Sequence, residues 1–124
     1  MVELLILLAI LGILLAIAYP FYDDHVTRTQ RSDATHTLLQ TWNELERCFI
    51  QRLQYSECSE VVPETSREGY YRIEAELEAG AFKLTARPVQ GGPQEGDEAC
   101  QEFTLDHQGR RGSAPEDPDD CWDR

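Results

Sequence analysis

The chain has 124 residues, which is enough for one small domain with one extended appendage. It is acidic, and residues 55–124 hold 17 of its 23 Asp and Glu but only seven of its 11 Lys and Arg. The resulting net charge of −10 in that half argues against nucleic-acid binding, because such affinity comes largely from Lys and Arg that displace counterions from phosphates.

Residues 4–22 contain no charged side chain and follow a single acid, Glu3. As a helix, this segment would extend roughly 28 Å, which is about the thickness of bilayer hydrocarbon. A cleavable signal peptide is the alternative, but it would need a basic residue before a shorter apolar run and a small-residue cleavage site. No basic residue precedes this run. We therefore predict a retained transmembrane helix over residues 1–22.

Glu3 has two interpretations, because a charge at membrane depth is costly and usually has a partner. It could lie in the headgroup region, where the helix dipole favours an acid in the first turn. Alternatively, it could pair with a positive group on a neighbouring subunit inside an apolar assembly. The physical argument alone favours the headgroup location.

Residues 23–54 show helical periodicity, with apolar side chains three or four positions apart. The apolar stripe consists of Ala34, Leu38, Trp42, Leu45, Phe49 and Leu53. The opposite, polar face is expected to carry Arg28, Arg31, Asp33, Asn43, Glu44, Arg47 and Gln51. One helix is therefore predicted over residues 2–54, and Pro20 is the position where it can kink.

The remaining residues, 55–124, read as a small β head. After a loop over residues 55–69, apolar and polar side chains alternate over residues 71–77 and again over 82–87, with a turn at Gly80 between them. This pattern predicts an antiparallel hairpin in which Lys83 and Arg87 face the acids of the first strand. After a second loop over residues 88–99, a third strand is expected around Phe103 and Leu105, and residues 110–124 are expected to form a loop.

The apolar face of the sheet and the apolar stripe of the helix would each be exposed to water unless they packed together. The predicted fold class is therefore α+β. A long N-terminal helix, with a membrane or filament half (1–22) and an amphipathic half (23–54), would pack on a small antiparallel sheet of three or four strands. The head has a small core, and its four cysteines could staple it: Cys48, Cys58, Cys100 and Cys121. Cysteines beside a membrane segment suggest disulfides formed in an oxidising compartment, and three pairings are open.

No pattern predicts a cofactor, metal or catalytic site. No two cysteines form a C-x-x-C pair, and His25, His36 and His107 lack the spacing of metal ligands, so a zinc site is not expected. The acidic cluster near the C-terminus lacks the spacing of a calcium loop and is expected to be solvated. It comprises Glu116, Asp117, Asp119, Asp120 and Asp123. We also find no nucleophile motif and do not expect an enzyme.

Residues 2–20, with a Glu near the start, Gly12 in the apolar run and Pro20 at its end, resemble the N-terminal helix of type IV pilins. The resemblance implies that Glu3 aids assembly by meeting the N-terminal amine of an adjacent subunit. It also implies that the helix can melt between Gly12 and Pro20 in assembled filaments. In that family a leader peptide and a usually aromatic first mature residue precede this pattern, so the mature start is expected about two residues before Met1.

Four segments of the second half resemble minor pilins of the PilE-like group: residues 81–88, 97–100, 103–109 and 120–122. The resemblance implies a Cys100–Cys121 bridge that closes the C-terminal loop, and with it a Cys48–Cys58 bridge. We expect Trp122 to pack near the first of these bridges.

The resemblance implies a minor structural subunit of a type IV pilus, with the N-terminal methylation typical of the family, acting in twitching motility. Its implied partners are other pilin subunits through the N-terminal helix, the inner membrane before assembly, and the pilus assembly machinery. It would occupy the bacterial inner membrane, with one membrane pass and the head in the periplasm, and later the extracellular pilus. The alternatives are a subunit that captures DNA or adheres to a surface, and a type II secretion pseudopilin.

Overall fold

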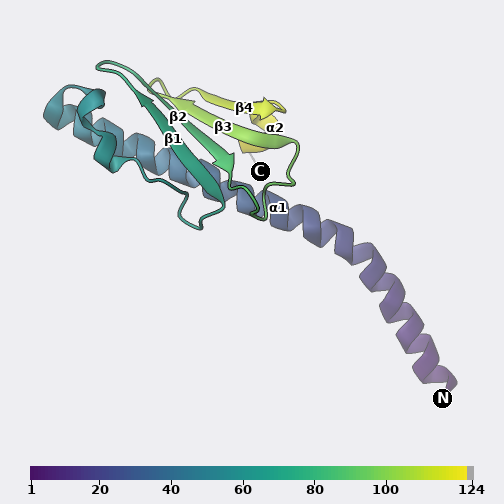
Figure 1. Ribbon diagram of the computed structural model, residues 1–124. Helices are drawn as coiled ribbons and strands as arrows, with labels where there is room; N and C mark the ends of the chain where they lie inside the picture. The colour runs from purple at the N-terminus through teal and green to yellow at the C-terminus, as the bar shows by residue number, and fades with distance from the viewer. Residues whose placement is uncertain (123–124) are drawn as a thin grey trace.

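A computed structural model describes residues 1–122 of the chain. One helix, α1 (Val2–Arg52), supplies both the N-terminal segment and one layer of the head. At 51 residues it extends about 75 Å. Figure 1 shows that its N-terminal half projects from the head and curves away from it, while its C-terminal half lies along the sheet. A single helix through the whole N-terminal region was predicted, and it ends two residues earlier than expected.

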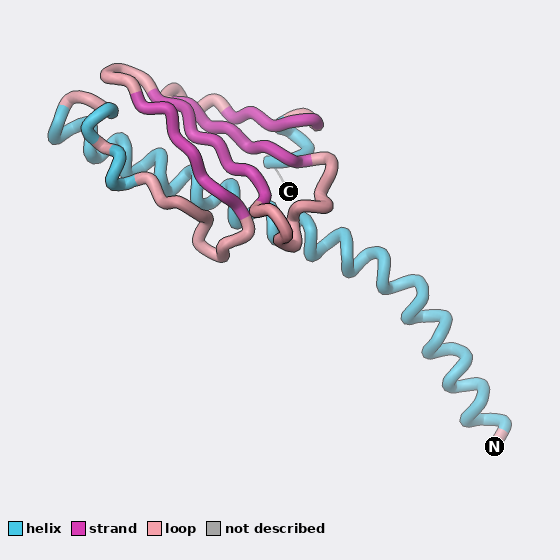
Figure 2. Tube along the Cα trace, viewed as in Figure 1, coloured by secondary structure: helices cyan, strands magenta, loops and turns pink. Residues whose placement is uncertain are grey.

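The sheet has four antiparallel strands in the order β1-β2-β3-β4 (Figure 2). These strands are β1 (Tyr71–Leu77), β2 (Phe82–Pro88), β3 (Cys100–Asp106) and β4 (Arg111–Pro115). A short helix, α2 (Pro118–Trp122), follows β4. The three strands expected from alternation are present, and the hairpin register places Glu76 opposite Lys83. The α+β fold is therefore confirmed.

The loop before the sheet is more ordered than its sequence suggested. It contains two short 3₁₀ helices, η1 (Tyr55–Glu57) and η2 (Ser59–Val61). Tyr55 is buried against α1, where its hydroxyl donates to Glu46 at 2.6 Å. Burial and then this carboxylate raise the pKa of Tyr55 to about 12. Tyr55 therefore holds the start of the loop against the helix, close to the Cys48–Cys58 bridge.

The expectation of a loop over residues 110–124 was wrong, because β4 and α2 lie there. The strand carries no large apolar residue, so alternation could not reveal it. It forms because β3 offers a free edge, and Phe103 pairs with Ser113 while Thr104 pairs with Gly112. A side chain at position 112 would meet the Thr104 hydroxyl and have to displace it, so glycine suits this close pairing.

The core lies between the inner sheet face and the amphipathic half of α1. Ala34, Leu38 and Leu45 of the predicted stripe are fully buried. Leu53, the last member of the stripe, was assigned wrongly, since 70% of it is exposed. Its φ of 64° places it in the left-handed region just after the helix, where its N–H caps the carbonyl of Phe49. Helical spacing no longer applies there, so its side chain points away from the core.

Candidate functional site

The projecting half of α1 is the most unusual surface of the molecule. Residues 1–25 are all exposed, and this helix is the one element of the described chain that is long and apolar enough to cross a membrane. Exposed apolar surface of this extent is not stable in water, so the segment requires lipid or other apolar helices around it. Because no residue of this segment is buried by the head, its apolar surface is available for contacts.

The three residues expected to act in assembly all lie on this projecting half. Glu3 is in the first helical turn and forms no ion pair within the described chain. Gly12 has open space where a side chain would be, and Pro20 lies inside the helix. Proline removes one helical hydrogen bond and glycine lowers helix propensity, so both weaken the helix locally. The structure does not bring these residues near one another or near the head.

Arg31 was expected on the exposed polar face of α1, and this was wrong. Its guanidinium forms a bidentate ion pair with Asp97, with both N–O distances 2.7 Å. The side chains are only 14% and 5% exposed. Hydrogen bonding to Asp97 raises the pKa of Arg31 against the opposing effect of burial. This pair joins the helix to the loop between β2 and β3, which sequence spacing could not reveal because 66 residues separate the partners.

Asp33 was also assigned wrongly to the solvent-exposed face, since only 8% of it is exposed. Its carboxylate accepts hydrogen bonds from the Ser66 hydroxyl, from the Glu68 N–H at 2.9 Å and from the Tyr70 N–H at 3.3 Å. The Ser66 hydroxyl oxygen in turn accepts the Tyr71 N–H at 2.9 Å. One helical carboxylate thus organises the turn that leads into β1, and this arrangement explains why an acid is tolerated in the core.

A groove of about 850 Å³ lies between α1 and the turn that Asp33 holds. His25 and His36 line it, together with Arg67 and Glu68 from the turn. Both histidines are exposed, and neither hydrogen-bonds to a carboxylate or hydroxyl within residues 1–122. His107 packs near Phe82, with ring centroids 6.3 Å apart. The three histidines are therefore not brought together.

The C-terminal acids lie on and around α2. Asp119 and Asp120 occupy its first turn, where acids are favoured by the helix dipole, and Asp123 lies outside the described residues. Within residues 1–122, no group of three or more His, Cys, Asp or Glu side chains is arranged to hold a metal ion.

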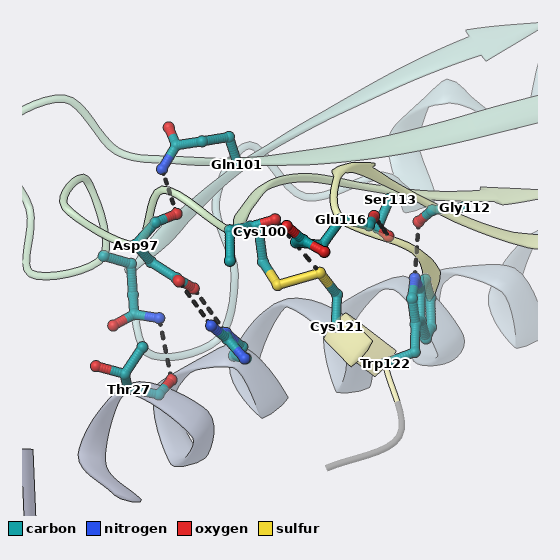
Figure 3. Close-up of a disulfide and its surroundings, with 12 residues drawn as sticks. Thr27, Asp97, Cys100, Gln101, Gly112, Ser113, Glu116, Cys121 and Trp122 are labelled. Carbon is teal, nitrogen blue, oxygen red and sulfur yellow. Dashed lines mark hydrogen bonds and ion pairs between the residues drawn. A yellow bond between two sulfur atoms is a disulfide. The ribbon is translucent and has the colours of Figure 1, made fainter. Parts of the chain in front are cut away.

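Two disulfides staple the head. Cys48 near the end of α1 is joined to Cys58, with 6.1 Å between their Cα atoms, and Cys100 at the start of β3 is joined to Cys121 in α2. Figure 3 shows the second bridge with Trp122 beside it. The Trp122 indole is buried, donates to the Gly112 carbonyl at 2.8 Å and meets Phe103 edge-on. The C-terminal segment is therefore fixed to the sheet at two adjacent points.

Ion pairs cross the outer sheet face. The Arg87 guanidinium bonds to Glu74 on β1 and to Glu102 on β3, each at 3.0 Å. The hydrogen bond to Glu102 is the largest cause of a raised pKa for Arg87. The predicted facing of Arg87 and the acids of β1 is confirmed. Exposed pairs of this kind add little stability, but they neutralise the arginine.

Asp106 holds the turn between β3 and β4. It accepts the N–H groups of Gln108 and Arg110, at 3.0 and 2.9 Å, and the Arg110 Nε at 2.8 Å. Burial acts to raise the pKa of Asp106, but these donors outweigh it and hold the pKa below its ordinary value. A lowered pKa means that the ionised form stabilises the fold above the unfolded-state pKa of about 4, and that this stabilisation is lost as the pH falls.

We therefore expect the Asp106→Asn chain to melt a few degrees below wild type at pH 7 and the difference to shrink as the pH falls below about 4. Thermal melts of both full chains in detergent from pH 7 to pH 3 measure this difference. Asp24→Asn, which removes an exposed carboxylate of α1, is the control. A difference that stays constant over this pH range would contradict the role assigned to the Asp106 charge.

Comparison with known proteins agrees with this architecture. Residues 20–104 match the family described as type IV minor pilin ComP, DNA uptake sequence receptor. A search of curated proteins gives no sequence match. The match begins at Pro20 and includes the amphipathic half of α1, strands β1 and β2, and β3 as far as Thr104. It therefore rests on the head and not on the apolar segment, whose composition many membrane helices share.

Two solved structures share the fold. The non-core minor pilin PilV of Neisseria meningitidis aligns with a TM-score of 0.62 at 22% identity, covering 73% of this chain and 88% of PilV. A type IV pilin from Shewanella oneidensis aligns with a TM-score of 0.54 at 22% identity, covering 79% of this chain and 99% of that pilin. These two likenesses show the fold, and the family match over residues 20–104 shows that the chain belongs to the ComP family of type IV minor pilins.

Proposed function

We propose that this minor pilin is anchored in the bacterial inner membrane by residues 1–22, with its head in the periplasm, and that the same segment then inserts into the pilus. The observation that carries the proposal is the fully exposed apolar half of α1, continuous with a helix that is packed into the head. An apolar helix that is bare on all sides suits two environments in turn, first lipid and then the helices of neighbouring subunits. The role is structural and not enzymatic.

Glu3 is proposed as the residue that docks and registers the subunit. In the membrane it can lie at the headgroup level, where its charge is solvated. In a filament core an unpaired carboxylate would be penalised by several kcal/mol, so only the register that gives it a positive partner is favourable. The N-terminal amine of the adjacent subunit is the partner that the family resemblance suggests. Gly12 and Pro20 would let the intervening helix adjust during this step.

DNA capture is the second candidate, because the matched family is described as a DNA uptake sequence receptor. The charges of this head do not favour it. Strands β1 to β3 carry three basic residues and four acidic ones, and Arg87 is already paired with two carboxylates. A DNA-binding surface is expected to present a basic stripe. We therefore propose pilus assembly as the main function and DNA capture as the second candidate.

The test is deletion of the gene, followed by measurement of surface pili, twitching and DNA uptake. We expect deletion to reduce pili and twitching, the full-length wild-type gene to restore both, and Glu3→Ala to restore neither although the protein reaches the membrane. Glu98→Ala, which changes an exposed acid of the head, is the control and should restore both. Pili at the wild-type level with Glu3→Ala would exclude the docking role. Normal pili with lost DNA uptake in the deletion strain would favour DNA capture.

A further inference from the structure

The loop between β2 and β3, residues 89–99, touches α1 where the helix leaves the head. No side chain of residues 1–26 forms a hydrogen bond or ion pair with the described residues outside α1. The first polar contacts between α1 and the rest of the head involve the Thr27 carbonyl and the Arg31 side chain. Both are made by residues of this loop. The contacting loop residues, Gln94 and Asp97, are 1% and 8% exposed, although the loop has no regular secondary structure. Buried polar side chains in a surface loop indicate a specific structural task.

The two loop residues contact the helix in different ways. The Gln94 Nε2 donates to the Thr27 carbonyl at 3.2 Å and to the Tyr71 hydroxyl of β1 at 3.0 Å. The Asp97 carboxylate accepts both hydrogen bonds from Arg31. Figure 3 shows Asp97 and the Thr27 carbonyl with these contacts as dashed lines. The loop is itself supported, because the Gln101 amide donates to the Asp97 carbonyl.

Thr27 and Arg31 are the two ends of one helical turn. In an α-helix the carbonyl of residue 27 accepts the N–H of residue 31. Gln94 therefore holds the Thr27 carbonyl, which accepts the hydrogen bond of that turn. Asp97 holds the side chain of Arg31, whose N–H donates it. This turn cannot unwind unless a bidentate, largely buried ion pair and a buried amide contact both break. Charge-assisted bidentate pairs are the stronger class of hydrogen bond.

The helix on the N-terminal side has no such support from the head. Pro20 lacks an N–H and interrupts the hydrogen-bond ladder, and a helix without tertiary packing is marginal in water. We infer that the β2–β3 loop is a clamp that ends the conformationally free part of α1 at Thr27, so that changes in the projecting half do not spread into the head. This inference concerns the folded chain itself and is independent of the docking role of Glu3.

Hydrogen exchange of the full chain in non-ionic detergent micelles, read by mass spectrometry, tests the clamp. We expect Asp97→Asn and Gln94→Met to speed exchange over residues 27–33 by about tenfold or more. Exchange over residues 38–48, which the core holds, should remain at the wild-type rate. Reversing the pair, with Arg31→Asp and Asp97→Arg together, is expected to restore part of the protection.

The matched control is Asp24→Asn, which removes an exposed pair with Arg28 one turn before the clamp, where the side chains are 64% and 53% exposed. It should leave exchange over residues 27–33 within twofold of wild type. The inference is overturned if both clamp variants also stay within twofold there. It is equally overturned if residues 38–48 accelerate as much as residues 27–33, because the contacts would then support the head as a whole.

Discussion

Replacing Phe103 with alanine is expected to lower the free energy of unfolding of the head by about 3–5 kcal/mol. Phe103 is fully buried at the centre of the core, where the rings of Tyr71 and Trp122 meet it edge-on with centroids 5.5 and 6.1 Å away. Its neighbours cannot collapse into the space, because β3 pairs on both sides and the Cys100–Cys121 bridge holds α2 in place. A loss of this size is comparable with the whole stability of a small domain.

Urea denaturation of the full chain in detergent, followed by circular dichroism and fluorescence, measures the Phe103→Ala effect. Ile50→Ala is the matched control, because Ile50 is a large apolar residue that is 75% exposed on α1. Its change should stay within about 0.5 kcal/mol. A loss below about 1 kcal/mol for Phe103→Ala would show that the sheet can close around the cavity and that the core is less rigid than its contacts indicate.

Replacing Asp33 with alanine is expected to destabilise the head by about 2–4 kcal/mol. The change leaves the Ser66 hydroxyl and the N–H groups of Glu68 and Tyr70 without their acceptor. An unsatisfied buried donor costs about 1–3 kcal/mol, which applies in full to the Ser66 hydroxyl, and water can replace part of the bonding of the two partly buried N–H groups. Asparagine at position 33 is expected to lose less, because its single amide oxygen can still accept from part of this set.

The same denaturation assay compares Asp33→Ala and Asp33→Asn with Asp24→Ala, which removes an exposed acid of the same helix. Exchange of the amides over residues 66–71 gives a local readout and should speed up in Asp33→Ala. If Asp33→Ala and Asp24→Ala had equal stability, the carboxylate would not organise the turn before β1.

Sequence pattern was sufficient where burial follows a regular period. The buried positions Ala34, Leu38 and Leu45 recur at helical spacing. Along the two hairpin strands, buried side chains alternate with more exposed ones. Strand β4 could not be predicted from periodicity. It forms by pairing with the edge of β3, where Gly112 allows a close approach, and neither feature gives a periodic pattern of apolar residues. Family resemblance suggested the assembly role proposed for Glu3, since physical reasoning alone favoured a solvated headgroup position.

The amino-acid sequence by itself determined that a long helix with an apolar, nearly uncharged N-terminal half would pack on a small antiparallel sheet, because apolar periodicity is a local property. Only the tertiary structure decided the roles of Arg31 and Asp33. An acid or base on a polar helix face looks the same in the sequence whether water or a distant partner satisfies it. Asp97 lies 66 residues from Arg31, and Ser66 lies 33 residues from Asp33. The folded chain brings these groups together, and burial then makes their pairing necessary.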